Sequence, residues 1–216
     1  MKGRIVIVIV VLLLASYSGL LAEEGVNGKW CSQLHPDRKE DFVDGYFDCL
    51  LIAGIVSAEE STYFDTHGMI AAVDAYVQGD PKRQSELLSP LMDRLIPQYL
   101  KHIKREGKGE PLCGPDASPF GWIGGEFWAT LHLPPFEGIS GRAAYLTGYL
   151  ECYRAHVKNG LHFSKPVSFY EAKLNEFYGV VDYPDSLSDF KQELACFPVA
   201  EALKKYADEV LEKPKR

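Results

Sequence analysis

The feature that most constrains this chain is an internal repeat of one glycine–tyrosine pattern. The segment Phe42–Cys49 matches the segment Tyr145–Cys152 at an offset of 103 residues. Every aligned pair except Asp44 and Thr147 is identical or chemically alike. Self-similarity at a fixed offset is a signature of repeated structural units. We therefore expect two copies of one module within the chain.

Further echoes of this repeat define the expected modules. Upstream, Gly28-Lys29-Trp30 and Leu34-His35 echo Gly125-Glu126-Phe127 and Leu131-His132 at an offset of 97. Downstream, the offset of 103 pairs Pro81 with Pro184, Ser85 with Ser188, Leu91 with Leu194, and Leu100-Lys101 with Leu203-Lys204. We expect module 1 at residues 23–106 and module 2 at residues 125–216. Residues 107–124, which are rich in glycine and proline, are expected to connect them.

Both modules are predicted to be helical. Apolar residues recur at three- and four-residue spacings from Lys39 to Glu60, and the counterpart helix runs from about 141 to 158. Proline, glycine and a Ser168–Glu171 capping box predict further helices, which are expected at about 65–79, 89–104, 168–182 and 199–211. Strand-like alternation is almost absent. The fold class is therefore predicted as all-α, with two similar helical modules braced by disulfides.

Glycines inside the two long helices predict a close contact. Gly45 and Gly148 occupy matching positions, although glycine within a helix costs about 1 kcal/mol relative to alanine. Their recurrence predicts that a neighbouring helix crosses closely at each position. The adjacent Tyr46 and Tyr149 are expected to be core aromatics with hydrogen-bonded hydroxyls.

The N-terminus has the pattern of a cleavable secretory signal. Lys2 and Arg4 precede an apolar run from Ile5 to Ala15, and Ala22 precedes an acidic pair. The run is shorter than the ~20 residues that span a bilayer. We expect residues 1–22 to be removed, the protein to be secreted or periplasmic, and no membrane span to remain. The net charge of −7 argues against nucleic acid as a partner.

Five cysteines in an exported chain predict disulfides, and the odd count leaves at least one thiol free or paired between chains. The five are Cys31, Cys49, Cys113, Cys152 and Cys196. We favour the pairs Cys31–Cys49 and Cys113–Cys152. A Cys49–Cys152 bridge across the two copies is the rival arrangement.

Catalytic and metal-binding motifs are absent from the sequence. The markers of serine hydrolases, zincins and phosphate-binding loops do not occur. Cys152, His156 and His162 form a metal-ligand alternative that we do not favour, and no cofactor is predicted. A hydrolase would have to use residues outside any motif, and the candidates are Asp48, Glu59, Glu151 and His156.

Four side chains are candidate functional contacts, and His156 is again among them. His35 and His132 recur after leucine in both copies, where a histidine that caps helix-end carbonyls is the expected role. Trp122 lies in the connector, which an aromatic residue would anchor on a packed surface. His156 lies near the end of the helix predicted at about 141–158 and completes the set.

Several of these features resemble one known family, the exported all-helical immunity proteins that neutralise peptidoglycan amidases delivered by type VI secretion. The shared features are a signal peptide, a Gly-Tyr helix, and a helix through Asp74-Ala75-Tyr76-Val77 that closes on Pro81. Leu112-Cys113-Gly114-Pro115 is similar to the family's Cys-x-Pro segment. The chain departs from the family in holding Val43 and Leu146 where a cysteine usually precedes the Gly-Tyr pair, and in having two modules.

The resemblance implies that the protein binds a partner through a groove or protruding loop, without catalysis. We accordingly expect an exported helical protein that binds another protein and inhibits it, with a cell-wall hydrolase as the expected partner. The alternatives are an exported hydrolase with a carboxylate and histidine site, and a small-molecule carrier that uses the crevice between the modules.

Overall fold

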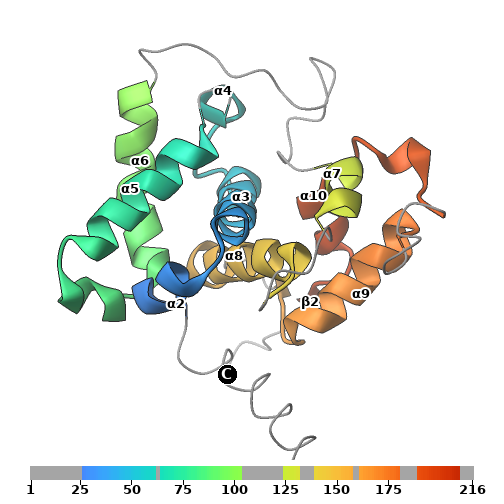
Figure 1. Cartoon of the computed structure of the whole chain (residues 1–216). Helices are drawn as coiled ribbons and strands as arrows, with labels where there is room; N and C mark the ends of the chain where they lie inside the picture. Colours follow the sequence, from blue (N-terminus) through green and yellow to red (C-terminus); the bar gives the residue numbers. More distant parts are fainter. Residues whose placement is uncertain are drawn as a thin grey trace, which may run out of the picture.

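A computed structural model describes residues 26–61, 64–103, 124–131, 139–157, 161–180 and 189–209. This part of the chain is mostly helical, as the apolar spacing predicts (Figure 1). The predicted signal peptide and most of the predicted connector lie outside the described residues, as do Cys113, Trp122 and His132.

The described elements fall into two groups along the chain. The first group is α2 (Gly28–Gln33), α3 (Pro36–Ile52), α4 (Ala58–Ser61), α5 (Thr66–Gln78), the 3-10 helix η1 (Pro81–Ser85) and α6 (Leu88–Ile103). The second group is α7 (Gly125–Thr130), α8 (Gly141–His156), β1 (Leu161–His162), α9 (Val167–Tyr178), the 3-10 helix η2 (Gln192–Leu194), α10 (Val199–Lys204) and β2 (Asp208–Glu209). The two short strands pair antiparallel, with Leu161 opposite Glu209.

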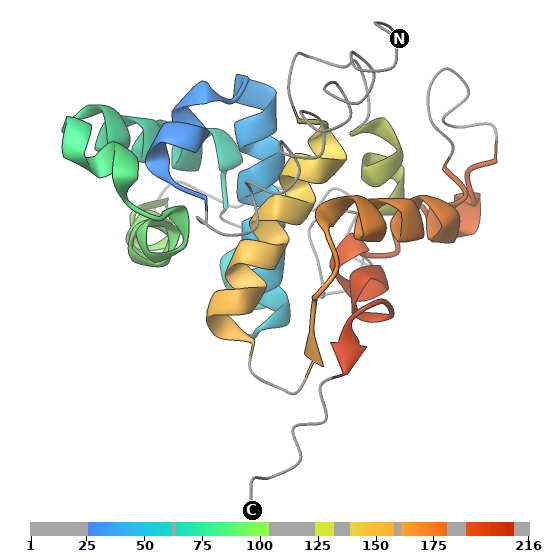
Figure 2. The same ribbon diagram turned by 90° about the horizontal axis from the view of Figure 1, so that it is seen from below.

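Helices α3 and α8 cross at the centre of the molecule. Helices α5 and α6 lie on one side of this pair, whereas α7, α9 and α10 lie on the other side (Figures 1 and 2). Most residues of α3 and α8 are buried, because neighbours cover them on more than one side. The central pair therefore forms the core that both groups of helices share.

The crossing is close where each helix carries its glycine, which confirms the prediction. A Cβ atom at Gly45 would lie 2.0 Å from the carbonyl oxygen of Tyr145. A Cβ atom at Gly148 would lie 2.0 Å from the carbonyl oxygen of Phe42. Only a residue without a side chain permits so short an approach between two backbones. The reciprocal contacts place Gly45 and Gly148 at matching points of the crossing.

A disulfide joins the two central helices, and it is the rival arrangement rather than the favoured one. Cys49 on α3 bonds to Cys152 on α8, with their Cα atoms 6.0 Å apart. The favoured pairs are wrong because the glycine crossing brings these two helix ends together. Cys31 keeps a free thiol inside the fold, where burial raises the thiol pKa to about 11. Cys196 is also free, and it is exposed.

The elements of the first group and those of the second group have a similar order along the chain. Asn27 forms an isolated bridge with Leu87 in the first group, and Gly124 forms one with Pro198 in the second. The two bridges relate position 87 to position 198, a separation of 111 residues, whereas the sequence match has an offset of 103. Leu91 lies in α6 and Leu194 lies in η2, so these two aligned leucines fall in different elements.

Three helices end earlier than predicted. Gly54 has φ of +69° and Gly179 has φ of +68°, so each adopts the left-handed conformation that closes a helix. In both places the residue after the glycine donates back across the last turn, from Ile55 to Leu50 and from Val180 to Asn175. These closures end α3 and α9. Helix α10 stops at Lys204, and the chain then forms β2 against β1.

The start of α9 also differs from its prediction. The helix begins at Val167 with Pro166 as its N-cap, and no side chain caps it. The expected capping box at Ser168 is therefore not formed, because Ser168 already lies within the first turn. By contrast, Asp65 caps α5 as the sequence suggests, accepting from the amides of His67 and Gly68.

Candidate functional site

A cleft of about 590 Å³ lies where the ends of α3 and α8 meet α4 and α6. Its walls are mostly apolar, and these residues form them: Leu50, Ile55, Val56, Ile96, Pro97 and Leu100. Four polar side chains also line it, namely Glu60, Asp93, Lys101 and His156. Asp93, Pro97 and Lys101 are spaced four residues apart, so they lie along one side of α6. The cleft is therefore an apolar groove that follows α6, with polar groups set along it.

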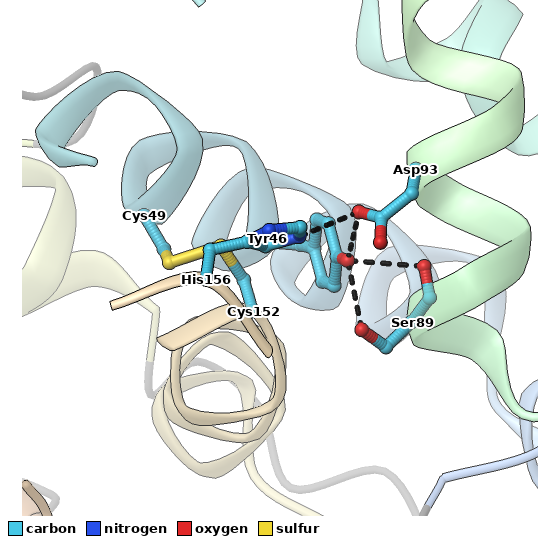
Figure 3. The surroundings of a disulfide bond; sticks show 6 residues. All are labelled: Tyr46, Cys49, Ser89, Asp93, Cys152 and His156. Carbon is cyan, nitrogen blue, oxygen red and sulfur yellow. Dashed lines mark hydrogen bonds and ion pairs between the residues drawn. A yellow bond between two sulfur atoms is a disulfide. The ribbon is translucent and has the colours of Figure 1, made fainter. Parts of the chain in front are cut away.

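Asp93 is the centre of a polar cluster on the wall of this cleft. We call Tyr46, Ser89, Asp93 and His156 the Asp93 cluster (Figure 3). Oδ1 of Asp93 accepts a hydrogen bond of 2.7 Å from the Tyr46 hydroxyl and lies 2.7 Å from Nε2 of His156. The Tyr46 oxygen also lies 3.0 Å from Oγ of Ser89, which can donate to it. The cluster thus joins α3, α6 and α8.

The disulfide lies beside the cluster and fixes two of its members. Tyr46 is three residues before Cys49 on α3, and His156 is four residues after Cys152 on α8. Residues at these spacings share a helix face. The covalent bond therefore holds the turn of α3 that carries Tyr46 close to the turn of α8 that carries His156 (Figure 3).

Burial sets the protonation of Tyr46. Desolvation raises the pKa of its hydroxyl well above the ordinary value, and the nearby Asp93 carboxylate raises it further, against a hydrogen bond from Ser89. Tyr46 is therefore a neutral donor at physiological pH. His156 is 21% exposed and Asp93 is 35% exposed, so both remain within reach of a bound molecule.

Nε2 of His156 is directed at the Asp93 carboxylate. A histidine ring that donates from Nε2 and is uncharged leaves Nδ1 as an acceptor. No described residue is hydrogen-bonded to that Nδ1. The arrangement provides a hydrogen-bond acceptor, an oriented imidazole and a carboxylate within one mostly apolar groove.

His156 is the predicted candidate that the structure places in the cleft. The other candidates for a hydrolase lie elsewhere: Asp48 is fully buried and accepts a 2.7 Å hydrogen bond from Tyr145. Glu151 is 3.0 Å from Arg154, and burial raises its pKa. Glu59 lies on α4, but its neighbour Glu60 lines the cleft instead. The four predicted residues are therefore not gathered into one site.

The structure places His35 at the start of a helix. His35 precedes α3, and its Nδ1 accepts from the amide of Asp37 in the first turn. It therefore caps an amide there, whereas the sequence led us to expect a cap on carbonyls. The metal alternative is contradicted, because the sulfur of Cys152 is bonded to Cys49. Among the described residues, no group of three or more His, Cys, Asp or Glu side chains is placed to hold a metal ion.

Comparison with known proteins yields no relative. No protein family matches the chain, and no curated protein or solved structure matches it either. Within the described ranges, no helix has both the length and the apolar character needed to cross a membrane.

A second set of polar groups is buried along α3, away from the cleft. Asp41 lies 2.8 Å from Arg38, and burial raises the pKa of this carboxyl to about 6. Asp44 accepts a 2.5 Å hydrogen bond from Thr66, and burial raises its pKa well above the ordinary value. These carboxyls pack inside the helical core, and their pKa values predict a pH dependence of stability.

The sequence did not indicate Asp93, the residue on which the cluster depends. Asp93 lies 63 residues from His156 along the chain. The sequence did hold one relevant signal. Tyr46 lies three residues before Cys49, and His156 lies four residues after Cys152. A Cys49–Cys152 bridge would have brought those two helix turns together, and the carboxylates of the next helix would then have been candidates.

Proposed function

We propose that this chain is an exported binding protein that holds part of a partner protein in its cleft. The observation that supports this most directly is the cleft itself. Its volume of about 590 Å³ and its mostly apolar walls with a few polar groups are typical of binding sites. Ile55 in the cleft wall is 49% exposed, so apolar surface is left for a partner to cover.

We also propose that the two groups of helices are copies that arose by duplication. The matching order of elements, the reciprocal contacts of Gly45 and Gly148, and the equivalent bridges of Asn27 and Gly124 support this proposal. Under this pairing, Tyr149 occupies the place of Tyr46.

The second copy is built without the Asp93 cluster. The positions that match Ser89, Asp93 and His156 hold Ala200, Lys204 and Ala53. The hydroxyl of Tyr149 is buried and has no hydrogen-bond partner among the described residues. The helix crossing therefore forms in one copy without these polar groups. This difference supports a role in binding for the Asp93 cluster, beyond helix packing.

The proposed partner is an enzyme that the protein inhibits, as in the immunity proteins that the sequence resembles. A disulfide between the central helices is consistent with export, since such bonds persist in oxidising compartments. A cell-wall amidase is therefore the first partner to test.

The test uses two aliphatic side chains of similar exposure. Ile55 is 49% exposed in the cleft wall, and Leu87 is 48% exposed and does not line the cleft. Covering half of an isoleucine contributes about 1 kcal/mol, so Ile55→Asn should weaken capture of the partner about fivefold. Leu87→Asn should leave capture unchanged. Capture is measured from the host's envelope and secreted fractions, and then with the purified amidase.

The proposal predicts one stoichiometric partner whose capture is weakened by Ile55→Asn and unchanged by Leu87→Asn. Equal capture by both variants would place the binding surface outside the cleft. A bound small molecule in place of a protein would favour the carrier alternative.

One observation favours the hydrolase alternative. Nδ1 of His156 is free of described partners while Asp93 orients the ring, and this is the arrangement of a general base. Hydrolysis of nitrophenyl esters with short apolar acyl groups tests it. His156→Ala should abolish any activity, and His162→Ala, at an exposed position, should not. Absence of hydrolysis in the unsubstituted protein, or equal rates in both variants, counts against a hydrolase.

A further inference from the structure

We propose that the cleft recognises a lysine side chain on an apolar segment of the partner, with the ammonium group at Asp93. This inference rests on the binding function proposed above and specifies the chemistry of the bound segment. It is supported by the oxygen acceptors of Asp93 at one end of the groove. It is also supported by the apolar residues and Lys101 farther along α6.

Asp93 presents one held oxygen and one open oxygen. Oδ1 accepts a hydrogen bond from the Tyr46 hydroxyl and contacts Nε2 of His156, so the carboxylate is fixed in place before anything binds. Oδ2 has no partner among the described residues (Figure 3). A fixed carboxylate loses little side-chain entropy when it accepts a further donor. Hydrogen bonds from a charged donor to such an oxygen are among the stronger ones.

Pro97 removes a hydrogen-bond donor from the main chain next to Asp93. It lies inside α6 and lines the cleft. Because proline has no N–H, the main-chain carbonyl of Asp93 lacks the donor that an unbroken helix would supply four residues later. Residue 93 therefore holds a side-chain oxygen without a described partner and a main-chain carbonyl without its usual helical donor. An ammonium group, which carries three donors and no acceptor, matches this set.

The rest of the groove fixes the direction of the bound segment. Pro97 follows Asp93 along α6, and Ile55 lies in the wall of the same cleft; both are exposed, so they can cover a methylene chain. Lys101 lies eight residues beyond Asp93, which is about 12 Å along a helix. Its positive charge disfavours a cation at that end. A basic group is therefore directed to Asp93, with apolar flanking residues over Ile55 and Pro97.

The charge of the whole chain agrees with this assignment. The net charge of −7 attracts basic partners over a distance and repels acidic ones. That long-range attraction is not specific, whereas the pair of acceptors at Asp93 selects one point of contact. Binding of the segment should therefore weaken as salt is added, and the size of this salt dependence should correspond to one ion pair.

The experiment compares three capped peptides on the unsubstituted protein by titration calorimetry. Each has leucine on both sides of a central residue, which is lysine, norleucine or glutamate. Norleucine keeps the methylene chain and removes the ammonium group. We expect the lysine peptide to bind at least tenfold more tightly than the norleucine peptide, and the glutamate peptide not to bind. Hexylamine is titrated as the small-molecule source of the same group.

Variants then locate the contact. Asp93→Asn keeps an acceptor for Tyr46 and should reduce the preference for lysine over norleucine to less than twofold. Glu193→Gln removes an equal charge from exposed η2 and should leave the preference intact. The comparison of peptides on the unsubstituted protein stands even if Asp93→Asn folds poorly.

The other outcomes overturn the inference in distinguishable ways. Equal binding of the lysine and norleucine peptides would mean that the apolar cleft binds the peptides and that it does not recognise the ammonium group. Hexylamine binding as tight as that of the lysine peptide would assign the site to a small amine. Absence of binding by all three peptides would contradict the inference. The proposed function would still be decided by the capture experiment with Ile55→Asn.

Discussion

Two tyrosines occupy matching places on the central helices, but their hydroxyls have different surroundings. The Tyr46 hydroxyl donates to Asp93 and lies within hydrogen-bond distance of Ser89, whereas the Tyr149 hydroxyl is buried without a described partner. A buried polar group without a partner costs about 1–3 kcal/mol. Tyr149→Phe should therefore stabilise the protein by about 1 kcal/mol, and Tyr46→Phe should destabilise it by about 1–2 kcal/mol.

Urea unfolding of the two variants measures this difference directly. Each removes one oxygen atom at an equivalent point of the crossing, so each serves as the control for the other. A loss of stability in Tyr149→Phe comparable to that in Tyr46→Phe would show that the hydroxyl of Tyr149 has a bonding partner.

The buried Asp44 predicts how stability changes with pH. Burial raises the pKa of its carboxyl, so the folded protein holds this proton to higher pH than the unfolded chain does. Stability from this group is therefore present at low pH and is lost as pH rises above about 4. Asp44→Asn keeps an acceptor for Thr66 and removes the charge. It should stabilise the protein by about 1–2 kcal/mol at pH 7 and by less near pH 4.

Unfolding at both pH values checks the sign. Burial also raises the pKa of Asp41, to about 6, so part of the pH dependence remains in the variant. Destabilisation by Asp44→Asn at pH 7 would mean that the ionised carboxylate is compensated in the folded protein.

Among the elements, the crossing of α3 and α8 depends on Gly45 and Gly148. A Cβ atom at either position would lie 2.0 Å from a backbone oxygen, and a backbone cannot move aside as a flexible side chain can. Gly45→Ala and Gly148→Ala should each destabilise the protein by about 3 kcal/mol or more, although alanine favours helix. Gly79→Ala is the control, since its nearest neighbours would lie at 3.1 Å or beyond.

Thermal unfolding followed by circular dichroism compares the three alanine variants. Gly79→Ala should shift the midpoint little, whereas the other two should lower it by many degrees. A small effect at Gly45 would mean that the helices separate easily, and the tight crossing would then be unimportant for stability.

The elements with strong local signals were predictable from the sequence. The apolar spacing of α8, the Asp65 cap of α5 and the proline after it are local features, and the helices formed there. The ends of α3 and α9 were missed because Gly54 and Gly179 act through a left-handed conformation that spacing does not reveal. The shortening of α10 depends on β1, which is distant in sequence.

The candidate site was predictable only in part, for a similar reason. His156 was identified because it shares a helix face with Cys152. Asp93 was missed because its role depends on α6 packing against the end of α8, a contact that no local pattern encodes. The disulfide was weighed as an alternative, since it follows from the repeat, but the helix geometry that decides it appears only in three dimensions.

At the scale of the whole molecule, the Cys49–Cys152 disulfide ties the two groups of helices together. Cys49 and Cys152 are separated by 103 residues, and together they enclose most of the first group and the connecting segment. The same bond lies beside Tyr46 and His156, so it couples the overall stability to the geometry of the cleft (Figure 3). Loss of the bond should therefore affect binding as well as stability.

Replacing both bonded cysteines tests this coupling. Closing a loop of about 100 residues restricts the unfolded chain, so Cys49→Ser with Cys152→Ser should lower the free energy of unfolding by about 3–5 kcal/mol. The exposed free thiol of Cys196 provides the control, and Cys196→Ser should change nothing. Helix content should persist in the double variant, because the glycine crossing still packs α3 against α8. Partner capture should nevertheless weaken, since the helix turns that carry Tyr46 and His156 are no longer tied. Full capture by a destabilised double variant would show that the cleft keeps its shape without the bond.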